Sequence, residues 1–172
     1  MNAPFETKLA FYAKVRAVCR EQVQFGDYSN ASELYSRCAQ VLKSIPKSKL
    51  ETMSEEELRQ RTESLTTLLT NIAHCLIKKN QLDKAIKAAK EAISFDPANF
   101  KAHLRLGQAL RDKHEFEEAV ESYKQAIKLQ PNDKGLRDDY KGMIDYKNAK
   151  VKEWNSKMMG FFDKAEVREK MA

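Results

Sequence analysis

Residues 69–99, LTNIAHCLIKKNQLDKAIKAAKEAISFDPAN, decide the fold, because they overlay residues 103–133, HLRLGQALRDKHEFEEAVESYKQAIKLQPND, at a shift of 34. Small residues and prolines coincide under this shift: the pairs are Ala73 with Gly107, Ala85 with Ala119, Ala92 with Ala126 and Pro97 with Pro131. Small side chains let two helices approach closely, and prolines separate one unit from the next. A period of this length predicts helix-turn-helix units that stack to bury a continuous core.

A more divergent unit precedes these two. In FGDYSNASELYSRCAQVL, residues 25–42, Ala31, Tyr35 and Cys38 take the places that Ala, Tyr and Ala hold at 119, 123 and 126. The offset from Ala31 to Ala85 is 54, so about 20 extra residues lie between the first and second units. We therefore expect three units, at about 10–45, 54–98 and 99–132, within residues 1–133.

The extra residues carry their own helix signals. Pro46 interrupts any helix, and Ser54 followed by Glu57 forms a capping box that starts a helix at Glu55. We expect a lengthened second helix in unit one, a turn at about 45–52 and a lengthened first helix in unit two. Residues 134–172 contain no proline and predict a long C-terminal helix, which would cap unit three with Tyr140, Met143, Ile144, Tyr146 and Val151.

Composition agrees with an all-α protein. The 172 residues are 42% hydrophobic and 33% charged, and only five Gly and four Pro interrupt them. A net charge of +6 favours acidic partners. Cys19, Cys38 and Cys75 lack metal-ligand spacing and predict reduced, buried thiols. We expect neither a signal peptide nor a transmembrane span, and a cytoplasmic or nuclear location.

The motifs of enzymes are missing from the sequence. It contains no Gly-rich phosphate loop, no Ser-His-Asp arrangement and no metal-ligand cluster, so we expect a non-catalytic protein without cofactor or metal. Nucleic-acid binding is not expected either, because 25 acidic residues dilute the positive charge and no binding motif is present.

The repeat resembles the tetratricopeptide repeat, whose pattern of small, aromatic and proline positions is matched in unit three at Gly107, Ala119, Tyr123, Ala126 and Pro131. Unit two has Ala89 where that pattern has an aromatic residue. The resemblance implies a right-handed superhelix of three helix pairs, with the first helix of each pair lining a concave groove.

Three groove positions carry donors for an anionic ligand. Lys101 and Arg105 lie one helical turn apart in unit three, and Asn71 holds in unit two the place of Arg105. Arginine binds a carboxylate through two hydrogen bonds and lysine adds a point charge. The three residues also resemble the carboxylate clamp of co-chaperones, which implies that the groove binds the acidic EEVD-type C-terminal tail of a heat-shock chaperone. We expect either the 90-kDa or the 70-kDa chaperone and favour the 90-kDa one.

Unit one departs from that clamp. In the register set by Ala31, the Lys of the clamp falls on Arg16 and its Asn falls on Arg20. Arg20 adds charge where the family has a neutral amide. The ligand would then be more acidic or differently seated, or this end of the clamp would be inactive.

The insertion and the long terminal helix resemble the tetratricopeptide domain of the large immunophilins of the peptidyl-prolyl isomerase family. The chain would then be a fragment without the isomerase domain. That resemblance implies calmodulin binding by the terminal helix, and an anionic membrane is the alternative. A third interpretation is that the apolar residues of this helix serve packing alone, against unit three or against a missing domain. The candidate residues are Lys150, Lys152, Trp154, Lys157, Met158, Phe161 and Phe162.

Overall fold

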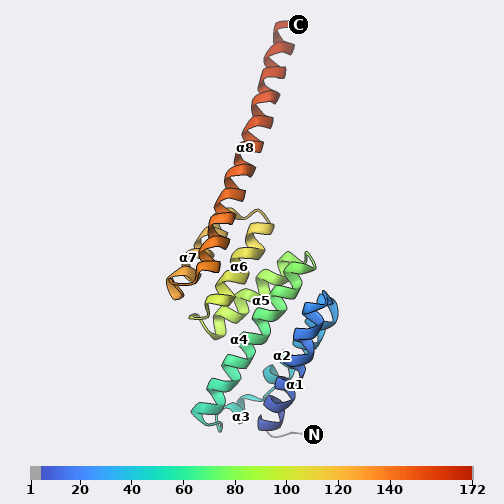
Figure 1. Ribbon diagram of the computed structural model, residues 1–172, viewed down its shortest axis with the longest axis vertical. Helices are drawn as coiled ribbons and strands as arrows, with labels where there is room; N and C mark the ends of the chain where they lie inside the picture. Colours follow the sequence, from blue (N-terminus) through green and yellow to red (C-terminus); the bar gives the residue numbers. More distant parts are fainter. Residues whose placement is uncertain (1–4, 172) are drawn as a thin grey trace. The chain divides into compact units, whose positions relative to one another are not determined.

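Helices account for nearly all of the chain in the computed structural model, which describes the backbone of residues 5–171 and the side chains of residue 5 and residues 7–161 (Figure 1). No strand occurs among these residues. The helices are α1 (Phe5–Gln24), α2 (Tyr28–Lys43), α3 (Lys47–Leu50), α4 (Glu55–Lys78), α5 (Leu82–Phe95), α6 (Phe100–Asp112), α7 (Phe116–Leu129) and α8 (Lys134–Met171). The all-α prediction is confirmed.

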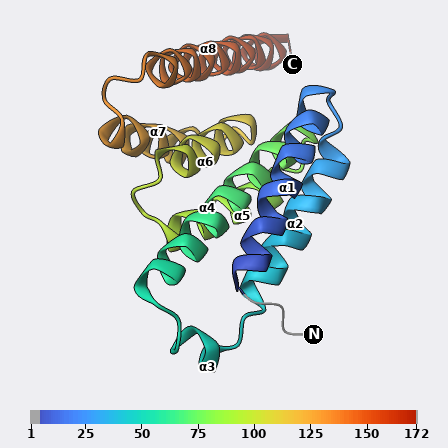
Figure 2. The ribbon, with the colours of Figure 1, turned by 60° about the horizontal axis from the view of Figure 1, so that its bottom comes forward.

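Consecutive helices pack as hairpins. Helix α1 packs on α2, α4 on α5 and α6 on α7, while α2 also packs on α4 and α5 on α6 (Figure 2). Helix α4 contacts α6 directly, so the first helices of the second and third hairpins are neighbours. Each hairpin therefore completes its core with the next one, as the repeat predicted.

The three hairpin turns share one backbone conformation. Gly26, Asn80 and His114 have φ values of 79°, 55° and 67°, which lie in the left-handed region. In each turn the N–H of the residue after the left-handed one donates to the carbonyl five residues back, as from Gln81 to Leu76 at 2.9 Å. These three residues are spaced by 54 and 34, which are the offsets that the sequence comparison predicted. The turns thus support the register assigned to unit one.

Inside each hairpin, one small position faces one variable position. Unit three pairs Gly107 with Tyr123, and a Cβ atom added to Gly107 would lie only 2.8 Å from the Tyr123 ring. Unit two has Ala73 and Ala89 at the same two places, both fully buried. The missing aromatic residue in unit two therefore accompanies a larger residue on the facing helix. Unit one holds Cys19 and Tyr35 there, exposed by 0% and 4%.

The insertion differs in part from the prediction. Ser54 and Glu57 form the predicted capping box, with Glu57 N–H donating to Ser54 Oγ at 3.2 Å, and α4 starts at Glu55. Helix α4 has 24 residues against 13 in α6, whereas α2 has 16, only slightly more than the 14 of α5. The expected turn at about 45–52 contains the short helix α3. Pro46 ends α2 early because it excludes helical backbone at the residue before it.

A few contacts hold the inserted segment to the hairpins. Arg61 of α4 donates through Nε to the Leu42 carbonyl oxygen at 3.1 Å, which joins α4 to the end of α2. Ile45 and Met53 are buried, with 6% and 8% of their surfaces exposed. The lengthened helix is thereby tied to unit one as well as to unit two.

The chain divides into two compact units between Asn132 and Asp133. Helix α8 alone makes up the second unit, starting at Lys134 as predicted, and Asp133 Oδ1 accepts a hydrogen bond from Leu136 N–H at 3.0 Å. The capping of unit three by this helix stays a prediction. No helix within the described part of the chain combines the length and the hydropathy that crossing a membrane requires.

Candidate functional site

Helix α6 presents two of the predicted site residues one turn apart. Lys101 is exposed, and its ammonium nitrogen lies 5.8 Å from the centre of the Phe100 ring. Arg105 is half-buried and donates through Nη1 to Gln108 Oε1 at 2.7 Å. Asn99 caps the helix by accepting from Ala102 N–H at 3.1 Å, which fixes where the helix begins and therefore where both cations project.

The charge of Arg105 affects a histidine, His74, on the neighbouring helix α4. Burial, together with the charges of Arg105 and Lys78, lowers the pKa of His74 to about 4. His74 lies one turn after Asn71, which is half-buried, and meets the Tyr28 ring edge-on at 6.2 Å between centroids. The structure therefore brings Arg105 close to the stretch of α4 that carries Asn71. His74 is neutral at pH 7 and adds no positive charge there.

His74 was not among the predicted site residues, and the structure adds it to the surroundings of Arg105. A signal was present in the sequence. His74 follows Asn71 by three residues, and residues three apart lie on one side of a helix.

The predicted site residues of α1, Arg16 and Arg20, are exposed and lie beside buried tyrosines. Burial raises the pKa of Tyr12, and the charge of Arg16 lowers it in part. Burial likewise raises the pKa of Tyr35 to about 12, with Arg20 opposing. Within the described side chains, neither arginine forms an ion pair with a carboxylate. Both charges are thus available on the surface of unit one.

The three cysteines lie one each on α1, α2 and α4. All three are free and buried. Burial raises the pKa of Cys19 and of Cys75 to about 11, and each of these thiols lies near another: Cys19 near Cys38, and Cys75 near Cys19. Protonated thiols are poor nucleophiles and poor metal ligands at pH 7. The prediction of reduced, buried thiols is confirmed for packing, and the described residues contain no group of three His, Cys, Asp or Glu side chains suited to a metal ion.

On α8, most of the predicted residues whose side chains are described are exposed. Trp154 and Phe161 expose 62% and 64% of their surfaces, Lys152 is exposed and Met158 is half-buried. Glu153 divides the basic face by accepting from Lys150 at 3.3 Å and from Lys157 at 2.7 Å. The Phe162 side chain lies outside the described residues.

Family models match the middle of the chain. The model described as "Tetratricopeptide repeat" matches residues 100–133, and a second, described as "TPR repeat", matches residues 73–113. Outer envelope protein 61 of Arabidopsis thaliana is 34% identical over 66% of this chain, and a small glutamine-rich tetratricopeptide repeat-containing protein 2 of Mycosarcoma maydis is 26% identical over 78%. This chain spans 18% and 32% of the lengths of those relatives.

Solved structures share the fold. The C-terminal TPR-containing domain of a putative FK506-binding protein of Plasmodium falciparum superimposes with a TM-score of 0.72 at 22% identity, covering 90% of this chain and 97% of that one. The myosin chaperone UNC-45 of C. elegans superimposes with a TM-score of 0.61 at 26% identity, covering 84% of this chain and 14% of that one. Residues 73–133 are therefore tetratricopeptide repeats, and the fold of the chain is that of a tetratricopeptide-repeat domain.

Proposed function

We propose that the surface formed by α1, α4 and α6 binds the acidic C-terminal tail of a heat-shock chaperone, and that the domain is a non-catalytic adaptor. The observation that carries this proposal is the position of Arg105, half-buried beside α4, with exposed Lys101 one turn before it. A partly buried guanidinium loses less hydration on meeting a carboxylate than a fully exposed one, and its charged hydrogen bonds are stronger than neutral ones.

The named relatives support the same ligand class. UNC-45 was solved in complex with a Hsp90 peptide. The first TPR domain of Spaghetti (RPAP3) was solved with the HSP90 peptide SRMEEVD, and the second TPR domain of human RPAP3 with the HSP70 peptide SGPTIEEVD. Both peptides end in Glu-Glu-Val-Asp, so their side-chain and terminal carboxylates suit a cationic groove. The 90-kDa chaperone is our first candidate.

Each site residue has a proposed role. Lys101 and Arg105 bind side-chain or terminal carboxylates, and Asn71 donates its amide to the terminal carboxylate or the peptide backbone. Arg16 supplies the cation of unit one. Arg20 adds a second cation in the same unit and favours a ligand with an additional acidic group.

Calorimetric titration with acetylated Met-Glu-Glu-Val-Asp and its C-terminally amidated twin tests the proposal. We expect micromolar binding that is lost on amidation and that weakens as salt increases. Lys101→Ala and Arg105→Ala should each cost about 1.5–3 kcal/mol of binding free energy. Lys124→Ala, which removes an exposed charge from α7, is the control and should change nothing.

Two results would sink the proposal. One is an affinity for the tail peptide that changes neither with the two substitutions nor with salt. The other is the absence of binding by either peptide, both in the wild type and after Arg20→Asn, which restores the amide of the related clamps. The chain spans less than a third of either relative compared above. An isomerase domain elsewhere in the whole protein is therefore a separate proposal.

The exposed Trp154 and Phe161 favour a second candidate function, binding of calmodulin or of an anionic membrane by α8. Removing residues 147–172 should abolish that binding and leave the affinity for the tail peptide unchanged. Retained calmodulin and vesicle binding after this truncation would contradict it.

A further inference from the structure

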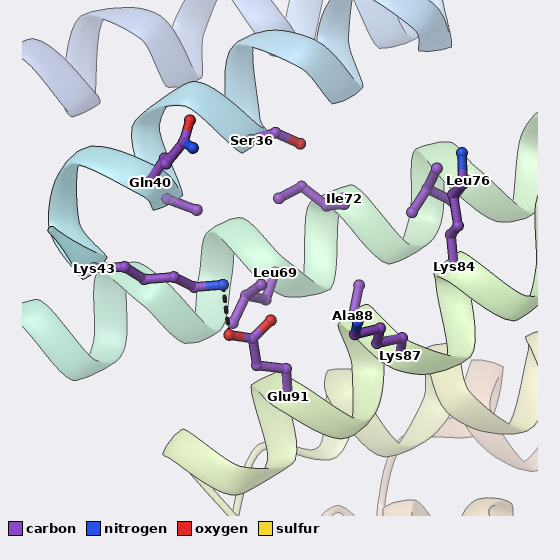
Figure 3. A pocket seen from close by; sticks show the side chains of 11 residues that line it. Ser36, Gln40, Lys43, Leu69, Ile72, Leu76, Lys84, Lys87, Ala88 and Glu91 are labelled. Atoms are coloured by element: carbon purple, nitrogen blue, oxygen red, sulfur yellow. Dashed lines mark ion pairs between the residues drawn. The ribbon is translucent and has the colours of Figure 1, made fainter.

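A recess lies between α2, α4 and α5, in the first junction between hairpins. Figure 3 shows the side chains that line it. Its volume is about 360 Å³. Leu69, Ile72 and Leu76 of α4 form its apolar floor, and Ala39 of α2 and Ala88 of α5 form parts of its two walls. Those alanines leave the recess open because neither reaches across to the other helix. Cavities that bind a ligand side chain or a small molecule start at about this size.

The recess is separate from the surface proposed above. Successive residues of a helix are rotated by about 100°, which places the row Leu69, Ile72 and Leu76 roughly opposite the row Asn71 and His74. A chain bound in the recess would therefore not compete with a peptide held by Arg105.

The two ends of the recess differ in charge. Helices α4 and α5 are antiparallel about their turn at Asn80, so Leu76 lies at the level of Lys84, and Leu69 at the level of Glu91. At the Leu69 end, Lys43 of α2 pairs with Glu91 at 2.5 Å and closes the recess. At the other end Lys84 and Lys87 are exposed, and neither pairs with a carboxylate among the described residues.

The second junction provides an internal comparison, because the repeat offsets assign each position an equivalent. Ile93 stands in the place of the alanine at 39, and its longer side chain would fill such a recess. Glu118 and Glu121 stand in the places of Lys84 and Lys87, and Glu118 approaches Lys90 at 4.0 Å. The same fold thus accepts a larger wall residue and the opposite rim charge, so neither feature of the first junction is a requirement of the repeat.

We propose that this recess docks an amphipathic helix of a partner protein, which inserts aliphatic side chains over Leu69, Ile72 and Leu76 and places acidic residues against Lys84 and Lys87. The floor residues are spaced by three and four, about 10 Å in length, which matches anchors at i, i+3 and i+7 of a bound helix. The partner's C-terminal end faces Lys84, because the negative end of a helix dipole is favoured near cations.

The test uses the whole chain and a designed helical peptide of about 18 residues, with leucine at i, i+3 and i+7 and glutamate at the flanking positions. Its two controls replace every glutamate by lysine or every leucine by alanine. Binding is measured by fluorescence anisotropy, and the binding surface by the NMR methyl signals of Leu69, Ile72 and Leu76.

We expect the glutamate peptide to bind with a Kd below about 100 μM, to shift those three methyl signals, and to bind at least about tenfold more tightly than either control. A spin label on its C-terminus should broaden Leu76 before Leu69. The substitution Ala39→Ile copies the second junction and should weaken binding at least about tenfold. Lys84→Glu with Lys87→Glu copies its charge and should reverse the preference toward the lysine peptide.

Several results would overturn the proposal. These are no binding of the glutamate peptide up to about 1 mM, equal binding of the lysine peptide, shifts confined to Asn71 and Arg105, and affinity unchanged by the double lysine substitution. Sedimentation gives a further one: a dimer of the wild type that dissociates on Ala39→Ile would assign the recess to a second copy of the chain. The lysine substitutions are on the surface, so they remain informative if Ala39→Ile lowers stability.

Discussion

Units two and three have the same backbone plan and fill it differently. Unit two pairs Ala73 with Ala89, while unit three pairs Gly107 with Tyr123, and all four residues are buried. In unit three the ring lies where a Cβ atom on its partner would come within 2.8 Å of it, whereas unit one holds Tyr35 opposite Cys19. The residue that fits at one position therefore depends on the residue that faces it, and a single position examined alone gives a misleading picture of the repeat.

The largest expected effect on stability comes from removing the aromatic ring of unit three. Tyr123→Ala should lower the free energy of unfolding by about 3–5 kcal/mol, because it removes a fully buried ring and leaves a cavity. Urea unfolding followed by circular dichroism measures it. A loss below about 1 kcal/mol would show that unit three closes over the gap and packs as unit two does.

Gly107→Ala tests the same contact from the other helix of unit three. The added methyl would lie 2.8 Å and 2.9 Å from two carbons of the Tyr123 ring, so the ring or the helix must move. We expect a loss of about 1–3 kcal/mol in the same unfolding experiment. The control is Gly160→Ala, where an added Cβ meets nothing within 4 Å and stability should not fall. Equal effects at the two glycines would remove the steric explanation.

The turns of the two units allow a smaller test. His114 has φ of 67° in unit three, where Asn80 has φ of 55° in unit two. Left-handed backbone is costly for His and milder for Asn, so His114→Gly should stabilise the protein by about 0.5–1 kcal/mol and Asn80→Gly by less. His114→Ala is the control and should give no gain. A gain from alanine equal to that from glycine would mean that the His side chain, not its backbone, is unfavourable.

The last difference between the units depends on pH. The pKa of His74 in unit two falls from 6.5 to about 4 on folding, chiefly through burial. The unfolded chain then binds more protons between these values, so this contribution to stability is complete above pH 6.5 and is lost as pH falls toward 4. Unfolding midpoints measured from pH 7.5 to 4.5 should fall less steeply in His74→Gln. An unchanged slope would place the pH dependence elsewhere.

Short-range signals in the sequence predicted much of the fold. The capping box at Ser54 started α4 where expected, and Gly26 supplied a left-handed turn at the expected offset. Boundaries that depend on packing were less accurate: α1 begins at Phe5 rather than near residue 10, and α3 interrupts the expected turn. Weak local preferences at such places are overridden by burial of residues such as Ile45 and Met53.

The candidate sites divide in the same way. The positions of Lys101 and Arg105 one turn apart follow from helical periodicity, and so does the place of Asn71 in the neighbouring unit. The approach of Arg105 to His74, and the neutral state of that imidazole, depend on how α6 packs on α4. No periodicity within one helix carries that information.

By itself, the sequence determined the helix pairs, their offsets of 34 and 54 and the faces on which charges lie, because these depend on local periodicity and small-residue spacing. Only the tertiary structure decided which faces meet. It paired Gly107 with the Tyr123 ring and left a recess between Ala39 and Ala88. The physical reason is that void and contact are properties of two or three helices together, set by the combined volume of side chains that lie far apart in the chain.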